Sequence, residues 1–418
     1  MLLAALLVSV LVGRPVAAQG EHQASWWDRT PDLRSAYYRI KSDLPTAEKR
    51  AYARHLDRMY EEYSRRLASL PARAPEKLDV FIFARHDEYL QTLKARWDID
   101  GKGTGGMFFV TSRGSGLAFW TESLPVRRVH HVIQHEGFHQ FAFSRFGHDL
   151  PIWVNEGLAE FFGESVLVND RVVLGQSTPR VIVEVQKAIE VNEHIPFRNM
   201  LSMDGSAWNQ SVKAGNAGLQ YMQAWSMVHF LVYGDDTAYQ RLFEDYLRLL
   251  NQGIASEAAF VRVFGPDIEA FERRWLGYAA EAKPSSFVTA LERIEFLAEG
   301  ALALSREGRS PESLDALREQ LEAIEFVHVI GTHGRAVELL ADDAENYAIP
   351  ADDLSKRAPS FSVKPVKRKR VTRRDERYEE IQPTPPDIRT SQLRPYELIV
   401  EWQRDRDTGA VHYKIVVR

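Results

Sequence analysis

The sequence contains no cysteine among its 418 residues. This absence excludes disulfide bonds, thiolate metal ligands and cysteine nucleophiles together. The hydrophobic and charged fractions, 44% and 27%, are ordinary for a soluble globular protein, so a hydrophobic core can stabilise the chain. The formal net charge of −5 is small for this length, so the whole molecule lacks the strong positive charge of a general nucleic-acid binder.

Long hydrophobic runs are scarce, and the one at the start of the chain is short for a membrane span. The opening MLLAALLVSVLVGRPVAAQG has an apolar run followed by small residues that are typical of a signal-peptidase site near Ala18. We therefore predict a signal peptide over residues 1–18 and export to a periplasmic or extracellular compartment. An uncleaved N-terminal membrane anchor is the alternative. Export without disulfides is more typical of a bacterial-type envelope protein than of a small eukaryotic secreted module.

The remaining pattern predicts an α+β protein. AYYRIKSDL and KLDVFIFARHDEY predict strands, and a helix from about Pro45 to Leu70 is expected between them. GGMFFVTSRGSGLAFW predicts two further strands joined by a turn at Ser112–Gly116. From about Pro125 onward the pattern is dominantly helical. We expect a small N-terminal mixed sheet with a helix, followed by a metal-binding helix pair and a helical lobe.

Changes in composition divide the chain after this lobe. An Asp407-Thr408-Gly409 turn lies between two alternating runs near the C-terminus, which indicates a β-hairpin that should dock onto another element. We predict one large domain over 25–283, a helical extension over 284–350, a basic, proline-rich linker over 351–392 and the hairpin over 393–418.

The predicted linker carries a strongly basic run. Seven Lys or Arg residues lie between Lys364 and Arg374, with no acidic residue among them. Interleaved aromatic residues are missing, so we expect no specific nucleic-acid partner. A weak contact with anionic envelope polymers or lipid head groups is one interpretation of this run, and a solvated linker without a partner is the other.

The stretch HEGFHQF, residues 135–141, carries the strongest chemical signal. His135 and His139 are four residues apart on a predicted helix, so both imidazoles project from one face and can reach one Zn²⁺ ion. Glu136 lies one step around the helix, where a carboxylate can take a proton from a zinc-bound water without ligating the metal. This is the chemistry of a His-Glu-x-x-His motif, and two core histidines that share a helix face are the alternative.

A second stretch, WVNEGLAEF at residues 153–161, offers the third ligand that a hydrolytic zinc site requires. Glu156 follows His139 by seventeen residues. A helix, a tight reversal and a second helix would bring this carboxylate beside the histidine pair. We therefore predict one Zn²⁺ ion per chain, bound by His135, His139 and Glu156.

HEGFH together with NEGLAE resembles the gluzincin metallopeptidases, the group of thermolysin and aminopeptidase N. The resemblance covers roughly residues 35–280 and is nearest to the bacterial exported peptidase MA-like family. It implies that His135, His139 and Glu156 are zinc ligands and that Glu136 is the general base. It also implies that Glu160 orients a ligand histidine, whereas an ordinary helix charge is the alternative role for Glu160.

Two features depart from this family pattern. The interval between His139 and Glu156 is a little shorter than in thermolysin or aminopeptidase N, so the connecting turn should be tighter. The aminopeptidase motif G-x-M-E-N, which binds the substrate amine, is absent, and Gly105-Gly106-Met107-Phe108 stands in its place. Cleavage inside a chain is therefore favoured over removal of N-terminal residues.

The family resemblance also implies a Tyr or His that stabilises the developing oxyanion. Tyr221 in LQYMQAWSMVHF has the best position in motif order, and His229 on the same predicted helix is the second candidate. Either residue could instead belong to the core. His130 and His131 precede the motif by about a turn, and we expect surface or supporting roles for them. By analogy with the fold, the MFFV strand could be the sheet edge along which a peptide pairs.

Together these patterns predict an exported zinc metallopeptidase, with Glu136 as general base and Tyr221 supporting the oxyanion. Two alternatives stay open. The same site could act on a non-protein amide such as a peptidoglycan cross-link. The chain could also be a non-catalytic envelope binding protein, in which the basic linker and the C-terminal hairpin bind the partner.

Overall fold

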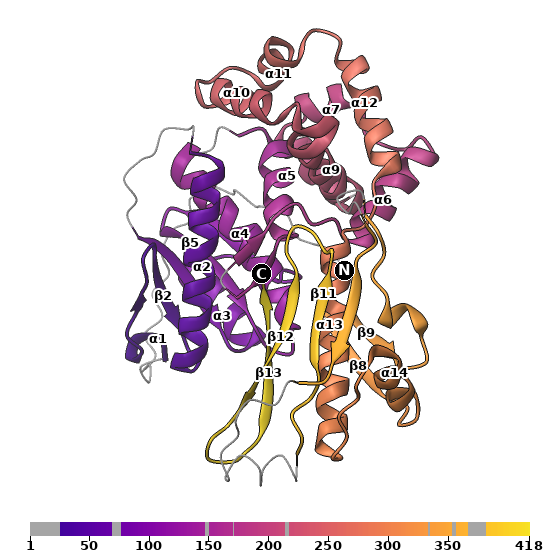
Figure 1. Cartoon of the computed structure of the whole chain (residues 1–418). Coiled ribbons are helices and arrows are strands. Elements are labelled where there is room, and N and C mark those ends of the chain that lie inside the picture. Colours follow the sequence, from indigo (N-terminus) through magenta and orange to yellow (C-terminus); the bar gives the residue numbers. More distant parts are fainter. Residues whose placement is uncertain are drawn as a thin grey trace. The chain divides into compact units, whose positions relative to one another are not determined.

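The computed structural model describes residues 26–68, 77–146, 150–169, 171–213, 217–332, 335–352, 357–366 and 382–418 (Figure 1). The predicted signal peptide lies outside these ranges, as does the part of the basic run that follows residue 366. The chain divides into two compact units. The first comprises residues through Ser165 together with Arg180–Ala282, and the second comprises Val166–Pro179 and Lys283–Arg418. The predicted α+β class is confirmed.

The N-terminal part of the first unit is a mixed five-stranded sheet with the strand order β1-β2-β3-β5-β4. Strands β2, β3 and β5 run parallel, whereas β1 and β4 pair antiparallel with their neighbours. β4 therefore lies at one edge of the sheet. The elements are α1 (Trp26–Arg29), β1 (Leu33–Arg34), β2 (Tyr38–Ser42), α2 (Thr46–Arg66), β3 (Leu78–Phe83), α3 (His86–Trp97), β4 (Gly106–Thr111) and β5 (Gly114–Trp120).

Two consecutive helices, α4 (Val126–Phe146) and α5 (Ile152–Gly163), form the centre of the first unit. α4 packs against β4 and β5, and α5 packs against both α4 and α9. Most residues of both helices are buried, which is the pattern of helices covered on all sides. The helical lobe continues with α6 (Pro179–Glu190), α7 (Phe197–Ser202), α8 (Gly205–Ser211), α9 (Ala217–Thr237), α10 (Gln240–Asn251), α11 (Ser256–Phe264) and α12 (Ile268–Glu281).

The second unit has its own hydrophobic core, which α13 shares with the C-terminal sheet. That sheet is antiparallel and has the strand order β10-β11-β12-β13. The elements are β6 (Val166–Val168), β7 (Arg171–Val173), α13 (Ser286–Arg306), α14 (Leu314–Glu322), β8 (Val327–Thr332), β9 (Arg335–Leu340), the 3-10 helix η2 (Ala344–Tyr347), β10 (Ser360–Lys364), β11 (Asp387–Ser391), β12 (Leu398–Arg404) and β13 (Val411–Val417).

The structure differs from the sequence interpretation in the region expected to be a linker, residues 351–392. Strands β10 and β11 lie within it and pair antiparallel over five residue positions. In each strand the buried residues alternate with more exposed ones, so one face of the pair covers the core. β12 and β13 make the expected C-terminal hairpin, which docks onto β11. The region expected to be a helical extension contains the additional hairpin β8–β9.

Among the residues that the structure describes, no helix combines the length and the apolar character that a membrane crossing needs.

Candidate metal centre

The α4 helix places His135 and His139 on one buried face. Their spacing of four residues aligns the two side chains, and each residue is 3% exposed. The two Nε2 atoms are 3.1 Å apart. The helix therefore presents two imidazole nitrogens to the same point in space, as the sequence predicts.

The α5 helix brings Glu156 to the same point. This residue is 1% exposed, and its Oε2 atom lies 3.5 Å from His135 Nε2 and 3.4 Å from His139 Nε2. The three side chains form a buried group that could hold a metal ion.

The distances between the three donor atoms fit a small metal ion with tetrahedral coordination. Ligand atoms at the bond lengths of a tetrahedral zinc site lie about 3.3 Å from one another. The three separations measured here, 3.1, 3.4 and 3.5 Å, bracket that value. Among the described residues, Glu156 Oε2 also has no hydrogen-bond partner although it is buried. A buried carboxylate oxygen without a donor is costly unless a cation accompanies it.

Opposing effects set the protonation of these groups. Burial favours the neutral form of Glu156, but His139 and His135 outweigh this effect and lower its pKa to about 2. Burial likewise disfavours protonation of His135, but Glu160 and Glu156 outweigh it and raise its pKa to about 9. A cation at the same point would replace the proton that these carboxylates attract.

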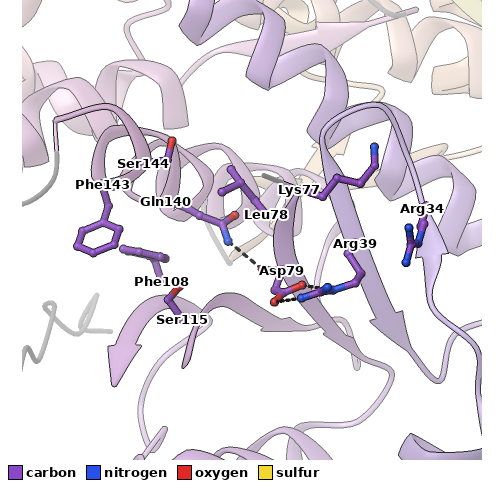
Figure 2. A pocket seen from close by; sticks show the side chains of 10 residues that line it. All are labelled: Arg34, Arg39, Lys77, Leu78, Asp79, Phe108, Ser115, Gln140, Phe143 and Ser144. Carbon is purple, nitrogen blue, oxygen red and sulfur yellow. Dashed lines mark hydrogen bonds and ion pairs between the residues drawn. The ribbon is translucent and has the colours of Figure 1, made fainter. Parts of the chain in front are cut away.

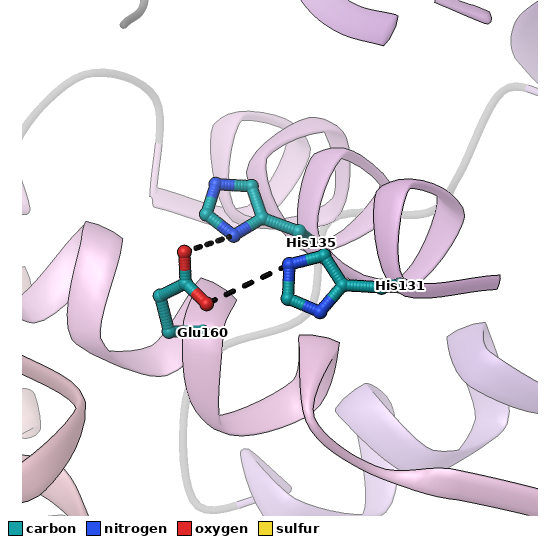
Figure 3. A group of neighbouring side chains, drawn as sticks. All are labelled: His131, His135 and Glu160. Atoms are coloured by element: carbon teal, nitrogen blue, oxygen red, sulfur yellow. Dashed lines mark ion pairs between the residues drawn. The ribbon is translucent and has the colours of Figure 1, made fainter. Parts of the chain in front are cut away.

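A second group of possible ligands, His131, His135 and Glu160, overlaps the first (Figure 3). The two oxygens of Glu160 face different histidines, at 3.4 Å from His135 Nδ1 and 3.7 Å from His131 Nε2. A neutral imidazole has one nitrogen lone pair, so His135 cannot ligate metal ions in both groups while it stays neutral. With Nε2 directed at Glu156 and His139, the Nδ1 atom of His135 faces Glu160 Oε1 at ion-pair distance, 3.4 Å. This is the arrangement in which a carboxylate orients a ligand histidine.

The His–Glu array extends beyond the residues that the sequence pattern singled out. His131 is 8% exposed, and its Nδ1 atom lies 3.9 Å from Glu164 Oε1. Its position is buried and not at the surface. A signal for this array is present in the sequence as two series with a spacing of four, His131-His135-His139 and Glu156-Glu160-Glu164. Sequence reasoning did not identify Glu164 because the packing of α4 against α5 determines which carboxylates face which imidazoles.

Glu136 lies next to the metal group and is held by a hydrogen bond from the sheet. It is 8% exposed, and its Oε2 atom accepts a 2.8 Å hydrogen bond from the backbone N–H of Phe108 on β4. Burial raises the pKa of Glu136, and the nearby His135 and His139 partly oppose this rise. The carboxylate is thus held by the sheet and is not part of either group of possible ligands.

Tyr221 on α9 lies close to the site. Its ring centroid is 6.3 Å from that of His135, and it packs edge-on against Trp208. Burial raises the pKa of Tyr221 well above its ordinary value, and the carboxylates of Glu156, Glu160 and Glu136 raise it further. The phenol therefore keeps its proton at neutral pH.

The other two candidate histidines have different surroundings. His229 Nδ1 lies 2.7 Å from the hydroxyl of Tyr278, and the ring stacks on Trp225. His130 packs against His55 of α2 with a ring separation of 4.2 Å. Burial, assisted by Arg127, lowers the pKa of His130 to about 4. These contacts account for both histidines as packing residues of the first unit.

The fold and the site therefore define an α+β protein with a buried His/Glu group that could hold a metal ion. The model of the family DUF1570, described as a protein of unknown function, matches residues 130–249. A search of curated proteins found no match. The family match spans α4 from His130, all of α5 and all of α9, so it includes both groups of possible metal ligands together with Glu136 and Tyr221. Since that family has no described function, a function for this chain has to be argued from the site.

Proposed function

We propose that this protein is an exported zinc-dependent peptidase of the gluzincin type that cleaves inside polypeptide chains. The observation that carries the proposal is the combination of three buried donor atoms 3.1–3.5 Å apart with a neighbouring carboxylate, Glu136, that is not one of them. A purely structural metal site needs no additional carboxylate at that position. The donor set of two histidines and one glutamate is also that of known hydrolytic zinc sites.

His135, His139 and Glu156 would hold the zinc ion, which would polarise a carbonyl oxygen and lower the pKa of water towards about 7. Glu136 would take a proton from the attacking water as the water oxygen bonds to the carbonyl carbon. It would pass that proton to the nitrogen when the carbon–nitrogen bond breaks. The raised pKa of Glu136 supports this role, because a carboxylate must hold the proton between the two steps.

Two further features support the proposal. The phenol of Tyr221, which stays protonated, could donate to the oxygen that gains negative charge. The edge position of β4 leaves one side of that strand without a neighbouring strand in the described sheet, so an extended peptide could add there. Since β4 carries Phe108, a peptide bound along it would pass beside Glu136.

The test is zinc content and hydrolysis of a quenched fluorescent peptide library by purified wild type, Glu136→Gln and Glu156→Ala. We expect one zinc per wild-type chain, loss of zinc in Glu156→Ala, and retention of zinc in Glu136→Gln with hydrolysis reduced by about 10²–10⁴-fold. Glu48→Gln, at an exposed position on α2, is the control and should match wild type.

Wild-type activity that survives Glu136→Gln would refute the assigned base. A wild type that binds zinc but cleaves no peptide would redirect the proposal to a non-protein amide. A wild type without zinc would favour the non-catalytic binding protein.

A further inference from the structure

A pocket of about 530 Å³ lies in the first unit between the sheet and the second half of α4 (Figure 2). Its two ends differ in chemistry. Phe108 and Phe143 lie at one end, and the cationic side chains of Arg34, Arg39 and Lys77 lie at the other.

The aromatic end adjoins the proposed catalytic base. Gln140 and Phe143 line the pocket, and they follow Glu136 on α4 by four and seven residues, so the three share one helix face. Phe108 also links the pocket to Glu136, because its side chain lines the pocket while its backbone N–H donates to Glu136. The pocket thus begins about one helical turn, roughly 6 Å, from the carboxylate that would activate water.

The basic end carries more positive charge than its own partners neutralise. Asp79 is the one acidic residue among the pocket's described lining residues, and both of its oxygens pair with Arg39. Lys77 donates to the backbone carbonyls of Ser35 and Ala36, which are uncharged. Within the described chain, the guanidinium of Arg34 makes no hydrogen bond or ion pair, and its residue is exposed. Two cationic charges therefore remain for a ligand.

We infer that this pocket binds an anionic group of the substrate, a carboxylate, and so makes the enzyme selective for acidic peptides. The inference rests on the proposed peptidase function. Glu136 accepts a hydrogen bond from β4, and four strand spacings separate β4 from β1, so Arg34 lies on the order of 20 Å from Glu136. At about 3.4 Å per extended residue, the carboxylate would lie about six residues from the scissile bond.

The test uses the zinc-loaded full chain and quenched peptides that differ in the position of a single Glu, each matched by a Gln peptide. A second series compares a free C-terminal carboxylate with a C-terminal amide, which distinguishes a terminal carboxylate from an acidic side chain.

The variants are Arg34→Glu and, as a control with the same charge change, Arg54→Glu on the exposed side of α2. We expect a carboxylate about six residues from the cleaved bond to raise kcat/KM about fivefold in wild type and in Arg54→Glu. The preference should disappear in Arg34→Glu and weaken at high salt.

A binding measurement separates this inference from the proposed function. Fluorescence anisotropy with labelled Glu and Gln peptides, on the Glu136→Gln background, requires no turnover. If wild type cleaves no peptide but the acidic peptide still binds more tightly through Arg34, the anion site stands and the peptidase proposal fails. The inference is overturned if cleavage or binding shows no preference for the carboxylate. It is also overturned if Arg34→Glu leaves that preference unchanged. Failure of all peptides to bind overturns it as well.

Discussion

At the scale of single residues, His135 has a carboxylate facing each of its two ring nitrogens. Glu156 lies 3.5 Å from Nε2, and Glu160 lies 3.4 Å from Nδ1. A neutral imidazole carries its proton on one nitrogen only, and a carboxylate at Nδ1 favours the proton there. A cation at the point shared with His139 and Glu156 would take the place of the proton at Nε2, and the remaining proton would lie on Nδ1, which faces Glu160. Glu160 would thus determine which nitrogen of His135 binds metal.

Glu160→Gln should weaken metal binding without removing a ligand. We expect zinc affinity to fall by about 10–100-fold, because the amide no longer provides a charged acceptor for the Nδ1 proton. Competition with a chromophoric chelator measures this affinity. The matched control is Glu184→Gln on the exposed face of α6, which should bind zinc as wild type does. Equal affinity in Glu160→Gln and wild type would show that Glu160 is only a packing residue.

The lowered pKa of His130 predicts that the free energy of unfolding depends on pH. Its pKa in the folded protein is about 4, because of burial and Arg127, whereas an unfolded histidine has a pKa of about 6.5. Below pH 6.5 the unfolded chain therefore binds a proton that the folded chain does not, and stability decreases as pH falls towards 4. For His130→Gln, we expect the loss of unfolding free energy between pH 7 and pH 5 to be smaller by about 2 kcal/mol.

Urea denaturation at the two pH values tests this expectation. The exposed Gln210 provides the control, since Gln210→Ala removes no titratable group and should leave the wild-type dependence unchanged. An identical loss in wild type and His130→Gln would contradict the assignment of a lowered pKa to His130.

At the scale of elements, the contact between α5 and α9 depends on Gly157, the glycine of the NEG stretch. A Cβ atom at this position would lie 2.6 Å from the carbonyl oxygen of Ala224 and 2.8 Å from a methyl group of Val228. The backbone of α9 therefore passes directly over this glycine. The same contact holds the helix that carries Tyr221 against the helix that carries Glu156.

Gly157→Ala should push the two helices apart. We expect unfolding free energy to fall by about 1–3 kcal/mol, because the methyl group meets backbone and cannot be accommodated by a side-chain rotation. Gly277→Ala on α12 is the matched control, since among the described residues no atom beyond the adjoining residues and backbone of its own helix lies within 4 Å of the added Cβ. That variant should be neutral or slightly stabilising. Comparable unfolding curves for the two variants would contradict the close approach of α5 and α9.

At the scale of the whole molecule, the end of the chain completes the core of the second unit. Phe361, Ile388 and Leu398 are buried in a cluster with residues of α13. Removal of residues 351–418 would uncover that cluster. Such a deletion would therefore remove more than a linker and a surface hairpin.

Ile388→Ala tests this role without truncating the chain. The side chain is fully buried, so we expect a loss of about 2–5 kcal/mol in unfolding free energy, measured with urea. Val366→Ala, at a position that is 42% exposed, should change stability by less than about 0.5 kcal/mol. A small effect at both positions would mean that β11 does not contribute to a cooperative core.

The local chemistry of the site was readable from the sequence, because two histidines four residues apart on a helix share a face. That rule places His135 beside His139 and leaves Glu136 one step around the helix. The strand–helix–strand opening and the C-terminal hairpin were also predictable, since their periodicities are local. By contrast, strands β10 and β11 lie in a region whose charge and prolines indicate a linker.

Only the tertiary structure decided which groups from separate elements face one another. The pairing of His131 with Glu160 and Glu164 requires the packing of α4 on α5, and the pocket beside Glu136 requires β1, β2 and β3 next to α4. No spacing along the chain encodes these distances, because they depend on how far apart the packed backbones lie. The sequence by itself determined which residues could bind a metal, and the packing determined their partners.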